Sequence, residues 1–282
     1  MVRSIIVEAG ATKSDWVVID GNGNRLTQFR SRGINVSAMR MDEVKSVLSE
    51  VLDSEHINQD IKGVYIYVAG VVTEPIRAEI ISHIQSVLPS AEVDVQDDLM
   101  GAARAVCGKQ PGIVAILGTG SNACRYDGKS ITRNVYSGGY ILGDEGGAAA
   151  LGKMFLSDYL KDIVPAQVAA DFAREFDASY SAIVEGVYRS ASPSGYLGSL
   201  APFILQHMDD EYMARIIRCN LESFADRFLS KYETDRLPVG VVGGFAWACQ
   251  DMLMLVLKER GIRLSRILKS PIDGLVDYHS GC

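Results

Sequence analysis

The chain has 282 residues, 48% of them hydrophobic and 22% charged, and a formal net charge of -7. This composition is that of an ordinary globular protein and excludes disordered, collagen-like and coiled-coil classes. The length fits one large domain or two of moderate size, and we expect two. Lysine and arginine form no run, so we expect neither nucleic acid nor a membrane surface as a partner and favour a small molecule.

Targeting and redox signals are few. The segment from Met1 to Ser4 lacks the apolar stretch of a signal peptide, and nowhere do ~18 apolar residues run together. We therefore expect a cytoplasmic protein. The cysteines contain no CxxC pair, which argues against a disulfide framework or a metal cage. They are Cys107, Cys124, Cys219, Cys249 and Cys282.

The first third of the chain alternates apolar runs with turn residues. We predict strands at 4–8, 15–20, 25–29, 63–70 and 93–95, with helices over 44–52 and 75–87. Pro75 suits the first turn of the second helix. Strands followed by alternating helices and strands predict a mixed sheet with helices packed against it.

The pattern restarts after "CGKQPG" at 107–112. We predict strands at 113–117, 123–126, 131–135 and 239–242, a helix-rich stretch from 145 to about 231, one long helix over 245–257 and a final strand and helix. Because both halves begin with three strands joined by turns, we predict a structural duplication, with domains at 1–111 and 112–270. Two unrelated α/β domains are the alternative.

Four turns rich in small residues follow apolar strands: "EAGATKS", "GTGSN", "GGYILGDEGG" and "VGGFA". Glycine permits a positive φ and lets backbone N–H groups approach an anion closely. Hairpin geometry alone does not require four such turns. The first of them is not a Walker loop, because Gly10 stands three residues before Lys13 and no glycine precedes it.

Two adjacent acids, Asp97 and Asp98, stand between a strand and a helix in "VDVQDDLMGAARAV". An aspartate here is favoured as a helix N-cap, and either residue could take that part. Two acids exceed what one cap needs. Since an open α/β sheet binds its ligands at the carboxyl ends of its strands, one of the two acids could serve as a general base.

Together these stretches resemble the sugar kinase, actin and Hsp70 superfamily, and within it the N-acetylglucosamine kinase and BadF-type ATPase group. "VEAGATKSDW" and "ILGTGSNA" are similar to its two phosphate motifs, "VGVVGGFAWA" to its adenosine motif, and "GDEGG" to the GDEGS segment of N-acetylglucosamine kinases. The ending "SPIDGLVDYH" is also similar. The resemblance implies two ribonuclease H-like (actin-like ATPase) domains with an interdomain cleft, the helix at about 271–282 packing back on the first domain.

The resemblance implies an ATP- and Mg²⁺-dependent kinase that phosphorylates a hydroxyl, expected to be the 6-hydroxyl, of N-acetylglucosamine or a related amino sugar. Asp98 matches the catalytic aspartate, because Gly101 matches the family's glycine in the same helix. Glu8 would assist magnesium through water. The residues matched to ATP are Gly10, Thr12, Lys13, Thr119, Gly120, Gly243 and Gly244. Those matched to sugar are Asn35, Asp98, Thr119, Gly138, Gly139, Asp144 and Glu145. Relatives are often dimers, so a homodimer is one candidate assembly.

Simpler interpretations exist for several of these residues. Asn35 could be a turn residue, and Asp144 could cap a helix that begins at Glu145. Lys13 could be a solvated loop lysine. Asp97, beside the catalytic candidate, is expected to be the N-cap.

The chain departs from the family pattern at two points. Glu8 stands where the first phosphate motif usually has aspartate, with Ala9 and Ala11 among its small residues. The sugar-stacking tryptophan of animal N-acetylglucosamine kinases has no match, since Gly138 takes the aligned position with Tyr140 nearby.

Two alternative functions follow from the same resemblance. An energising ATPase would hold an iron–sulfur cluster through paired cysteines at a subunit interface, and the cysteines here form no convincing pair. A non-catalytic sugar or nucleotide sensor is compatible with the altered first motif.

Overall fold

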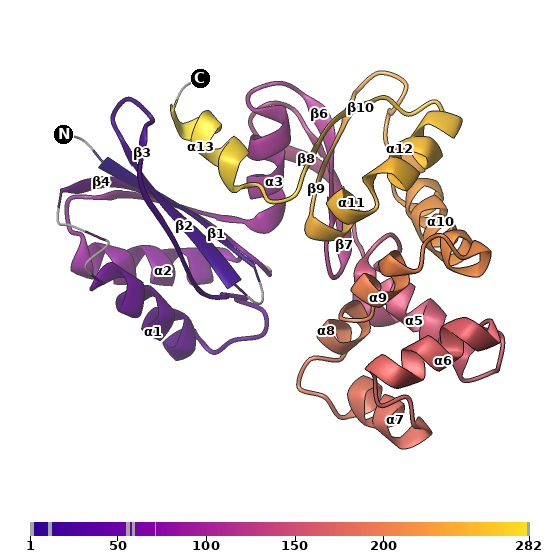
Figure 1. Ribbon diagram of the computed structural model, residues 1–282. Helices are drawn as coiled ribbons and strands as arrows, with labels where there is room; N and C mark the ends of the chain where they lie inside the picture. The colour runs from indigo at the N-terminus through magenta and orange to yellow at the C-terminus, as the bar shows by residue number, and fades with distance from the viewer. Residues whose placement is uncertain (1–2, 11–12, 55–56, 58–59, 71, 281–282) are drawn as a thin grey trace. The chain divides into compact units, whose positions relative to one another are not determined.

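The structure is a computed structural model that describes residues 3–10, 13–54, 57, 60–70 and 72–280 (Figure 1). The chain divides into two compact units. Unit 1 comprises Met1–Gln110, Gly128–Ser130 and Ser270–Cys282, and unit 2 comprises Pro111–Asp127 and Ile131–Lys269. Unit 1 therefore contains both the first and the last elements of the chain.

Unit 1 is built on a mixed sheet whose described strands have the order β3-β2-β1-β4-β5. β1 pairs antiparallel with β2 and parallel with β4, and β4 pairs parallel with β5. Its elements are β1 (Arg3–Ala9), β2 (Lys13–Asp20), β3 (Arg25–Arg32), α1 (Met41–Leu52), β4 (Ile61–Val68), α2 (Glu74–Val87), β5 (Glu92–Asp97), α3 (Asp98–Cys107) and α13 (Ile272–Ser280).

Helices cover both faces of the unit 1 sheet, with α1 and α2 on one face and α3 and α13 on the other (Figure 1). Ile5, Ile6 and Val7 are therefore all buried, although neighbours on a strand point to opposite faces. This explains the unbroken apolar run of β1, which is typical of strands covered on both sides.

The last helix, α13, packs on α3. Gly274 lies directly against the backbone of Ala105. The His279 ring stacks on Tyr65 with centroids 3.8 Å apart, and its Nε2 lies 2.7 Å from the hydroxyl of Tyr67. These contacts fix α13 both to α3, the helix that begins at Asp98, and to β4.

Unit 2 repeats the topology, because its described strands have the order β10-β9-β6-β7-β8 with β6 central, as β1 is in unit 1. The predicted structural duplication is thus confirmed. Its elements are β6 (Gly112–Leu117), β7 (Ser121–Tyr126), β8 (Ile131–Val135), α4 (Gly139–Leu142), α5 (Ala148–Tyr159), α6 (Ala166–Glu175), α7 (Tyr180–Tyr188), α8 (Pro193–Gly198), α9 (Ala201–Gln206), α10 (Glu211–Arg227), η1 (Leu229–Lys231), β9 (Val239–Val242), α11 (Gly244–Ala248), α12 (Gln250–Glu259) and β10 (Leu264–Leu268).

The prediction of one long helix over 245–257 is wrong, because Cys249 separates α11 from α12 with φ -114° and ψ 28°. The Cys249 thiol is buried and donates to the carbonyl of Phe245 at 3.1 Å. The apolar pattern continues through the break, with Phe245 before it and Leu253 after it buried in the same core. Periodicity alone therefore gave no sign of two helices.

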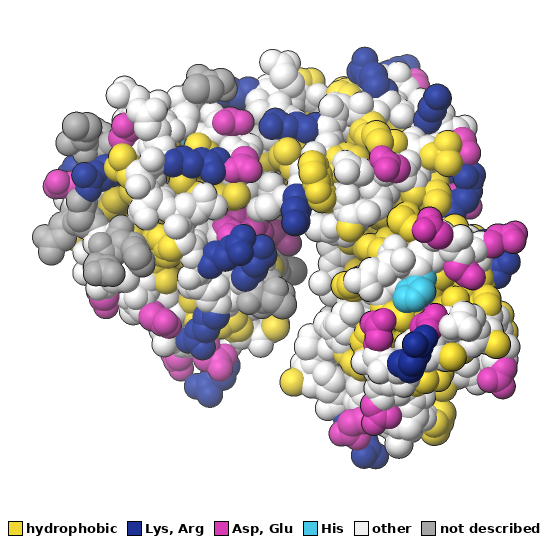
Figure 2. Space-filling model, in the orientation of Figure 1, with side chains coloured by type: hydrophobic (Ala, Val, Ile, Leu, Met, Phe, Trp, Pro, Cys, Tyr) yellow, Lys and Arg dark blue, Asp and Glu magenta, His cyan; other side chains and the backbone are white. Residues whose placement is uncertain are grey.

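Figure 2 shows lysine and arginine side chains interleaved with aspartate and glutamate on the visible face of the molecule. Within the described ranges, no helix combines the length and the apolar character needed to cross a bilayer.

Candidate functional site

The first predicted phosphate turn joins β1 to β2. The amide of Gly10 donates to the carbonyl of Lys13 at 2.9 Å, and the Gly10 carbonyl accepts from Ile34 at 3.0 Å. Thr12 lies outside the described residues, so its predicted contact with phosphate has no structural account. The two strands pair as far as Ala9 and Ser14, so the segment that joins them is too short to wrap a phosphate.

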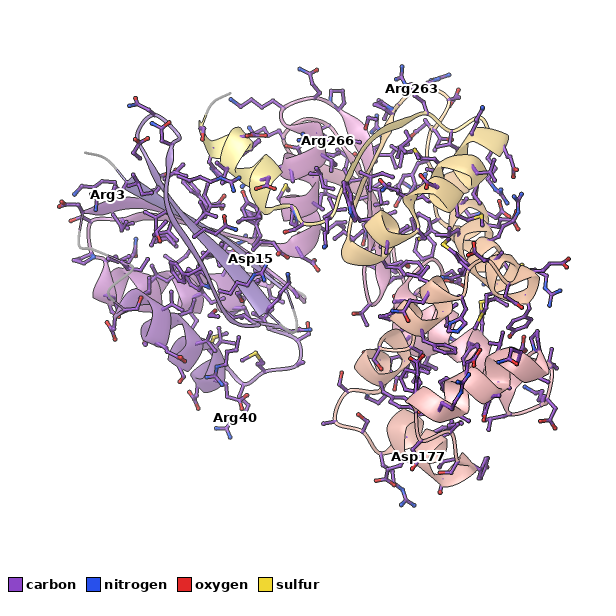
Figure 3. All side chains as sticks on the ribbon, in the orientation of Figure 1. Arg3, Asp15, Arg40, Asp177, Arg263 and Arg266 are labelled. Carbon is purple, nitrogen blue, oxygen red and sulfur yellow. The ribbon has the colours of Figure 1, made fainter. Side chains whose placement is uncertain are left out.

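Lys13 opens β2, and its side chain is 55% exposed. Its Nζ lies 3.4 Å from the Asp15 carboxylate, which also accepts from Arg30 Nε at 2.7 Å. Asp15, labelled in Figure 3, is buried at 2% exposure. Burial of an unpaired carboxylate costs free energy, and the two cations beside Asp15 offset that cost.

Sequence reasoning missed Asp15, although a signal for it exists. Within the antiparallel pair β1–β2, Asp15 stands directly opposite Glu8, and on β3 its partner is Arg30. An acid that starts an apolar strand and faces an acid on one neighbour and an arginine on the other can be found once the strand register is drawn.

Asp97 and Asp98 divide two tasks between them. The Asp97 side chain accepts from the amide of Met100 at 2.7 Å, which confirms its predicted N-cap role on α3. Asp98 is therefore released from capping. Because Asp97 pairs with Val68 and Val68 with Ala9 across the parallel strands, Asp98 follows the carboxyl ends of β5, β4 and β1.

The carboxyl groups at this edge ionise with difficulty. Burial raises the pKa of Asp98 to about 7, and the charge of Asp97 adds to the effect. Burial also raises the pKa of Glu8 to about 7, reinforced by Asp15 and Asp98 and opposed by Lys13. Close carboxylates disfavour each other's charged forms, so a cation near them is stabilised.

The donor set fits a magnesium ion that arrives with a nucleotide. Within the part of the chain that the structure describes, no cluster of three or more histidine, cysteine, aspartate or glutamate side chains could hold a metal alone. Mg²⁺ commonly binds one or two carboxylates together with substrate phosphates and waters. A cation beside Glu8 would favour its ionised form. Glu8 therefore suits the role of one carboxylate among phosphate and water ligands.

Asn35 lies beside the same sheet edge, because it bridges Ala69, whose amide donates to the carbonyl of Ala9 at 2.8 Å. Its Oδ1 accepts from the amide of Ser37 at 3.0 Å. That side-chain contact two residues on is the geometry of a turn residue. Unit 1 thus brings Glu8, Lys13, Asn35 and Asp98 to neighbouring strand ends.

The second predicted phosphate turn in unit 2 is Gly118–Gly120, between β6 and β7. The amides of Ala148 and Ala149, at the start of α5, donate to the carbonyls of Gly118 and Thr119 at 2.9 and 2.8 Å. A Cβ on Gly120 would lie only 2.7 Å from Asp144 Oδ2, so a larger residue at this position would displace the Asp144 carboxylate. The turn and Asp144 are therefore packed together.

Asp144 does not cap a helix at Glu145. α5 begins at Ala148 with Gly147 as its N-cap, and Asp144 adopts a left-handed φ of 60°. Its Oδ1 lies 3.4 Å from the amide of Ser121, and burial raises its pKa. Glu145 makes an ion pair with Arg227 at 2.9 Å. Asp144 is thus aimed at the second turn, which the capping interpretation did not foresee.

Gly138 and Gly139 lie just before Asp144, with φ of 77° and 68° around the start of α4. The segment carries large apolar side chains exposed to solvent, with Tyr136 at 89% and Leu142 at 83%. No role was predicted from the sequence for Tyr136 or Leu142, although large apolar side chains in a glycine-rich segment are a sign of an exposed apolar surface.

The glycines of the adenosine motif differ in their packing. Gly243 has a φ of 140°, and a Cβ on it would lie 2.1 Å from the carbonyl oxygen of Leu117, the last residue of β6. Gly244, which opens α11, has open space where a Cβ would stand. Gly243 is therefore required by the fold, whereas Gly244 leaves a surface that a ligand could approach.

Comparison with known proteins identifies a family and a fold for this chain. Residues 7–276 match the model of the BadF/BadG/BcrA/BcrD ATPase family. A putative N-acetylglucosamine kinase from Porphyromonas gingivalis shares 36% identity and a TM-score of 0.93, with 100% of this chain and 99% of that chain covered. No curated protein matches the chain in a sequence comparison.

Two more distant structures share the fold. A putative N-acetylglucosamine kinase from Chromobacterium violaceum has 20% identity and a TM-score of 0.77, with 98% of each chain covered. A ROK family glucokinase from Streptomyces griseus, in complex with glucose and AMPPNP, has 16% identity and a TM-score of 0.56, with 98% of this chain and 97% of that chain covered. The predicted α/β fold of the actin-like ATPases is confirmed, and the chain belongs to the BadF/BadG/BcrA/BcrD ATPase family.

Proposed function

We propose that this protein is an ATP-dependent sugar kinase that phosphorylates the 6-hydroxyl of N-acetylglucosamine or a related N-acetylated hexosamine. The observation that carries the proposal is Asp98, a carboxylate at a strand end with a pKa of about 7 and no capping duty, because Asp97 is the cap. The relative with 36% identity supports the choice of sugar.

Asp98 is the group we assign to the attacking hydroxyl. A general base works best when its pKa lies near the working pH, and burial gives Asp98 that value. Phosphoryl transfer depends mainly on positioning and on charge stabilisation, so one well-placed base is enough. Asp98 would accept the hydroxyl proton as the oxygen attacks the γ-phosphorus.

We assign phosphate contacts to two turns. At the first turn Lys13 supplies an ammonium group, and Gly10, whose amide donates to the Lys13 carbonyl, allows a close backbone approach. At the second turn Thr119 and Gly120 supply a hydroxyl and a backbone amide. Gly243 and Gly244 are assigned to the adenosine. MgATP supplies the phosphoryl group and the cation, and Glu8 would meet the cation through water.

Sugar recognition is assigned to Asn35 and Asp144, with Gly138, Gly139, Thr119 and Glu145 around them. Asp144 is nearly buried and is held against the Gly120 turn, so its carboxylate has few orientations available. A fixed carboxylate can accept two sugar hydroxyls with geometric selectivity.

The test is a coupled ADP-release assay with MgATP and a panel of sugars. We expect N-acetylglucosamine or N-acetylmannosamine to give the highest kcat/KM, above N-acetylmuramic acid, glucosamine and glucose. The 6-deoxy analogue of the best sugar should bind without turnover. Equal ADP release with and without sugar would instead favour an energising ATPase, and ATP binding with no ADP release would favour a sensor.

A further inference from the structure

Asn220 is a buried polar side chain to which the sequence assigns no role. It lies in the middle of α10 and is 1% exposed. Its Oδ1 accepts from the amide of Gly146 at 2.9 Å, and its Nδ2 donates to the carbonyl of Gly147 at 3.1 Å. The oxygen and the nitrogen of the Asn220 side chain therefore both bind the backbone of the turn that follows Asp144.

The same face of α10 makes two more contacts with this turn. Phe224, four residues after Asn220, packs directly on Gly146. Arg227, three residues further on, pairs with Glu145 at 2.9 Å. Residues spaced by four and three lie on one side of a helix. The helix thus holds consecutive residues of the turn with one stripe of side chains.

The turn needs outside support because its backbone is strained. Asp144 has a φ of 60°, a conformation that costs a non-glycine residue free energy and persists only where its surroundings fix it. Its carbonyl accepts from the amide of Gly147 at 2.9 Å, next to the carbonyl that Asn220 binds. The Asn220 contacts therefore act on the residue at which the chain is bent.

We propose that Asn220 is a positioning residue that holds the Asp144 carboxylate in its sugar-binding orientation. The identity of the ligand rests on the proposed kinase function, whereas the mechanical claim does not. A residue that only stabilised unit 2 would change the melting temperature and leave the substrate constants alone. A positioning residue changes the constant of the ligand that Asp144 binds.

The expected signature is a split between the two substrates. Replacing Asn220 by leucine leaves the Gly146 amide without its partner, and such a buried loss corresponds to about tenfold in an equilibrium constant. We expect KM for the sugar to rise about tenfold. KM for ATP should rise less than KM for the sugar, because the Gly118–Gly120 turn, although the amides of Ala148 and Ala149 contact it, also keeps the pairing of the β6–β7 hairpin.

The matched control is Met213→Ala. Met213 is fully buried on the same helix and the same side, seven residues before Asn220, which is about 10 Å along the axis. Both variants should lose melting temperature, and only Asn220→Leu should raise KM for the sugar. Hydrogen exchange supplies a readout without substrate, since amides of the 143–148 segment should exchange faster in Asn220→Leu than in Met213→Ala.

Arg227→Met provides a second variant that is safe for folding, because the Arg227 side chain is 69% exposed. We expect it to raise KM for the sugar less than Asn220→Leu does, with faster exchange over the same segment. Unchanged sugar KM and unchanged exchange in both variants would overturn the proposal. If the wild type phosphorylates no sugar while exchange responds as described, the kinase function fails and the positioning role stands.

Discussion

The two units share one strand order but prepare their sites differently. Unit 1 gathers carboxyl groups whose ionisation is disturbed, with Glu8 and Asp98 both having a pKa of about 7. Unit 2 relies on close backbone packing, with Gly120 against Asp144 and Gly243 against Leu117. The two copies of a duplicated fold can therefore differ in what they supply: titratable carboxyl groups in one copy, and closely packed backbone in the other. Substitutions should accordingly change rates and pH profiles in unit 1, and folding and substrate fit in unit 2.

The largest effect is expected for Asp98→Asn in unit 1. Loss of the general base should lower kcat by about a hundred- to ten-thousand-fold, while the isosteric side chain leaves ATP affinity within about threefold. Steady-state kinetics and calorimetric titration with ATP test both parts. A kcat within tenfold of the wild type would remove Asp98 from the chemistry and with it the contrast between the units.

Gly243→Ala should be the most damaging change for the packing of unit 2. The added Cβ would meet the Leu117 carbonyl at a φ of 140°, and we expect a loss of more than about 2 kcal/mol of unfolding free energy. Gly244→Ala is the matched control, because the space beside it is open. Urea unfolding distinguishes them, and equal midpoints would show that the close approach is not required.

Stability should also depend on pH in a way that unit 1 explains. The folded pKa values of Glu8 and Asp98 lie above the ordinary value near 4, so the fold favours their protonated forms. Their contribution to the free energy of unfolding is fully present below pH ~4 and is lost as pH rises through 7. Urea unfolding from pH 4.5 to 8 should therefore lose part of this slope in Asp98→Asn. An unchanged slope would mean that Asp98 titrates normally.

The smallest effect is expected for Asp97→Asn, and it should be confined to the pH profile. Asparagine caps helices as well as aspartate does, so α3 should keep its stability. Removal of the neighbouring negative charge lowers the pKa of Asp98, and the acid limb of kcat/KM near pH 7 should move to lower pH by less than about one unit. A limb that stays in place would mean that Asp97 does not act on the base.

Most of the fold could be predicted because buried strands and turns have strong local signals. The apolar runs of the first strands and the restart after residues 107–112 located the central strands and the second copy of the topology. The break at Cys249 could not be seen, because the residues on both sides are apolar at helical spacing. The local pattern of apolar residues predicts which segments are buried. It does not predict where one buried helix ends and the next begins.

The site residues divide along the same line. Adjacent acids after a strand were visible in sequence, and the cap contact of Asp97 then separated their roles. Asp15 was missed because its burial depends on Arg30, which lies on another strand. Asn220 was missed because a single amide in an amphipathic helix has no local sign of what it binds. Roles that depend on a distant partner need the tertiary structure.

The return of α13 to unit 1 has a consequence for how the protein is made. α3 and β4 are translated well before α13, whose Gly274 packs on α3 and whose His279 contacts Tyr67 of β4. On the ribosome, the nascent first sheet and α3 must wait for residues 272–280 while all of unit 2 is synthesised. Unit 1 therefore cannot acquire its complete packing until α13 emerges.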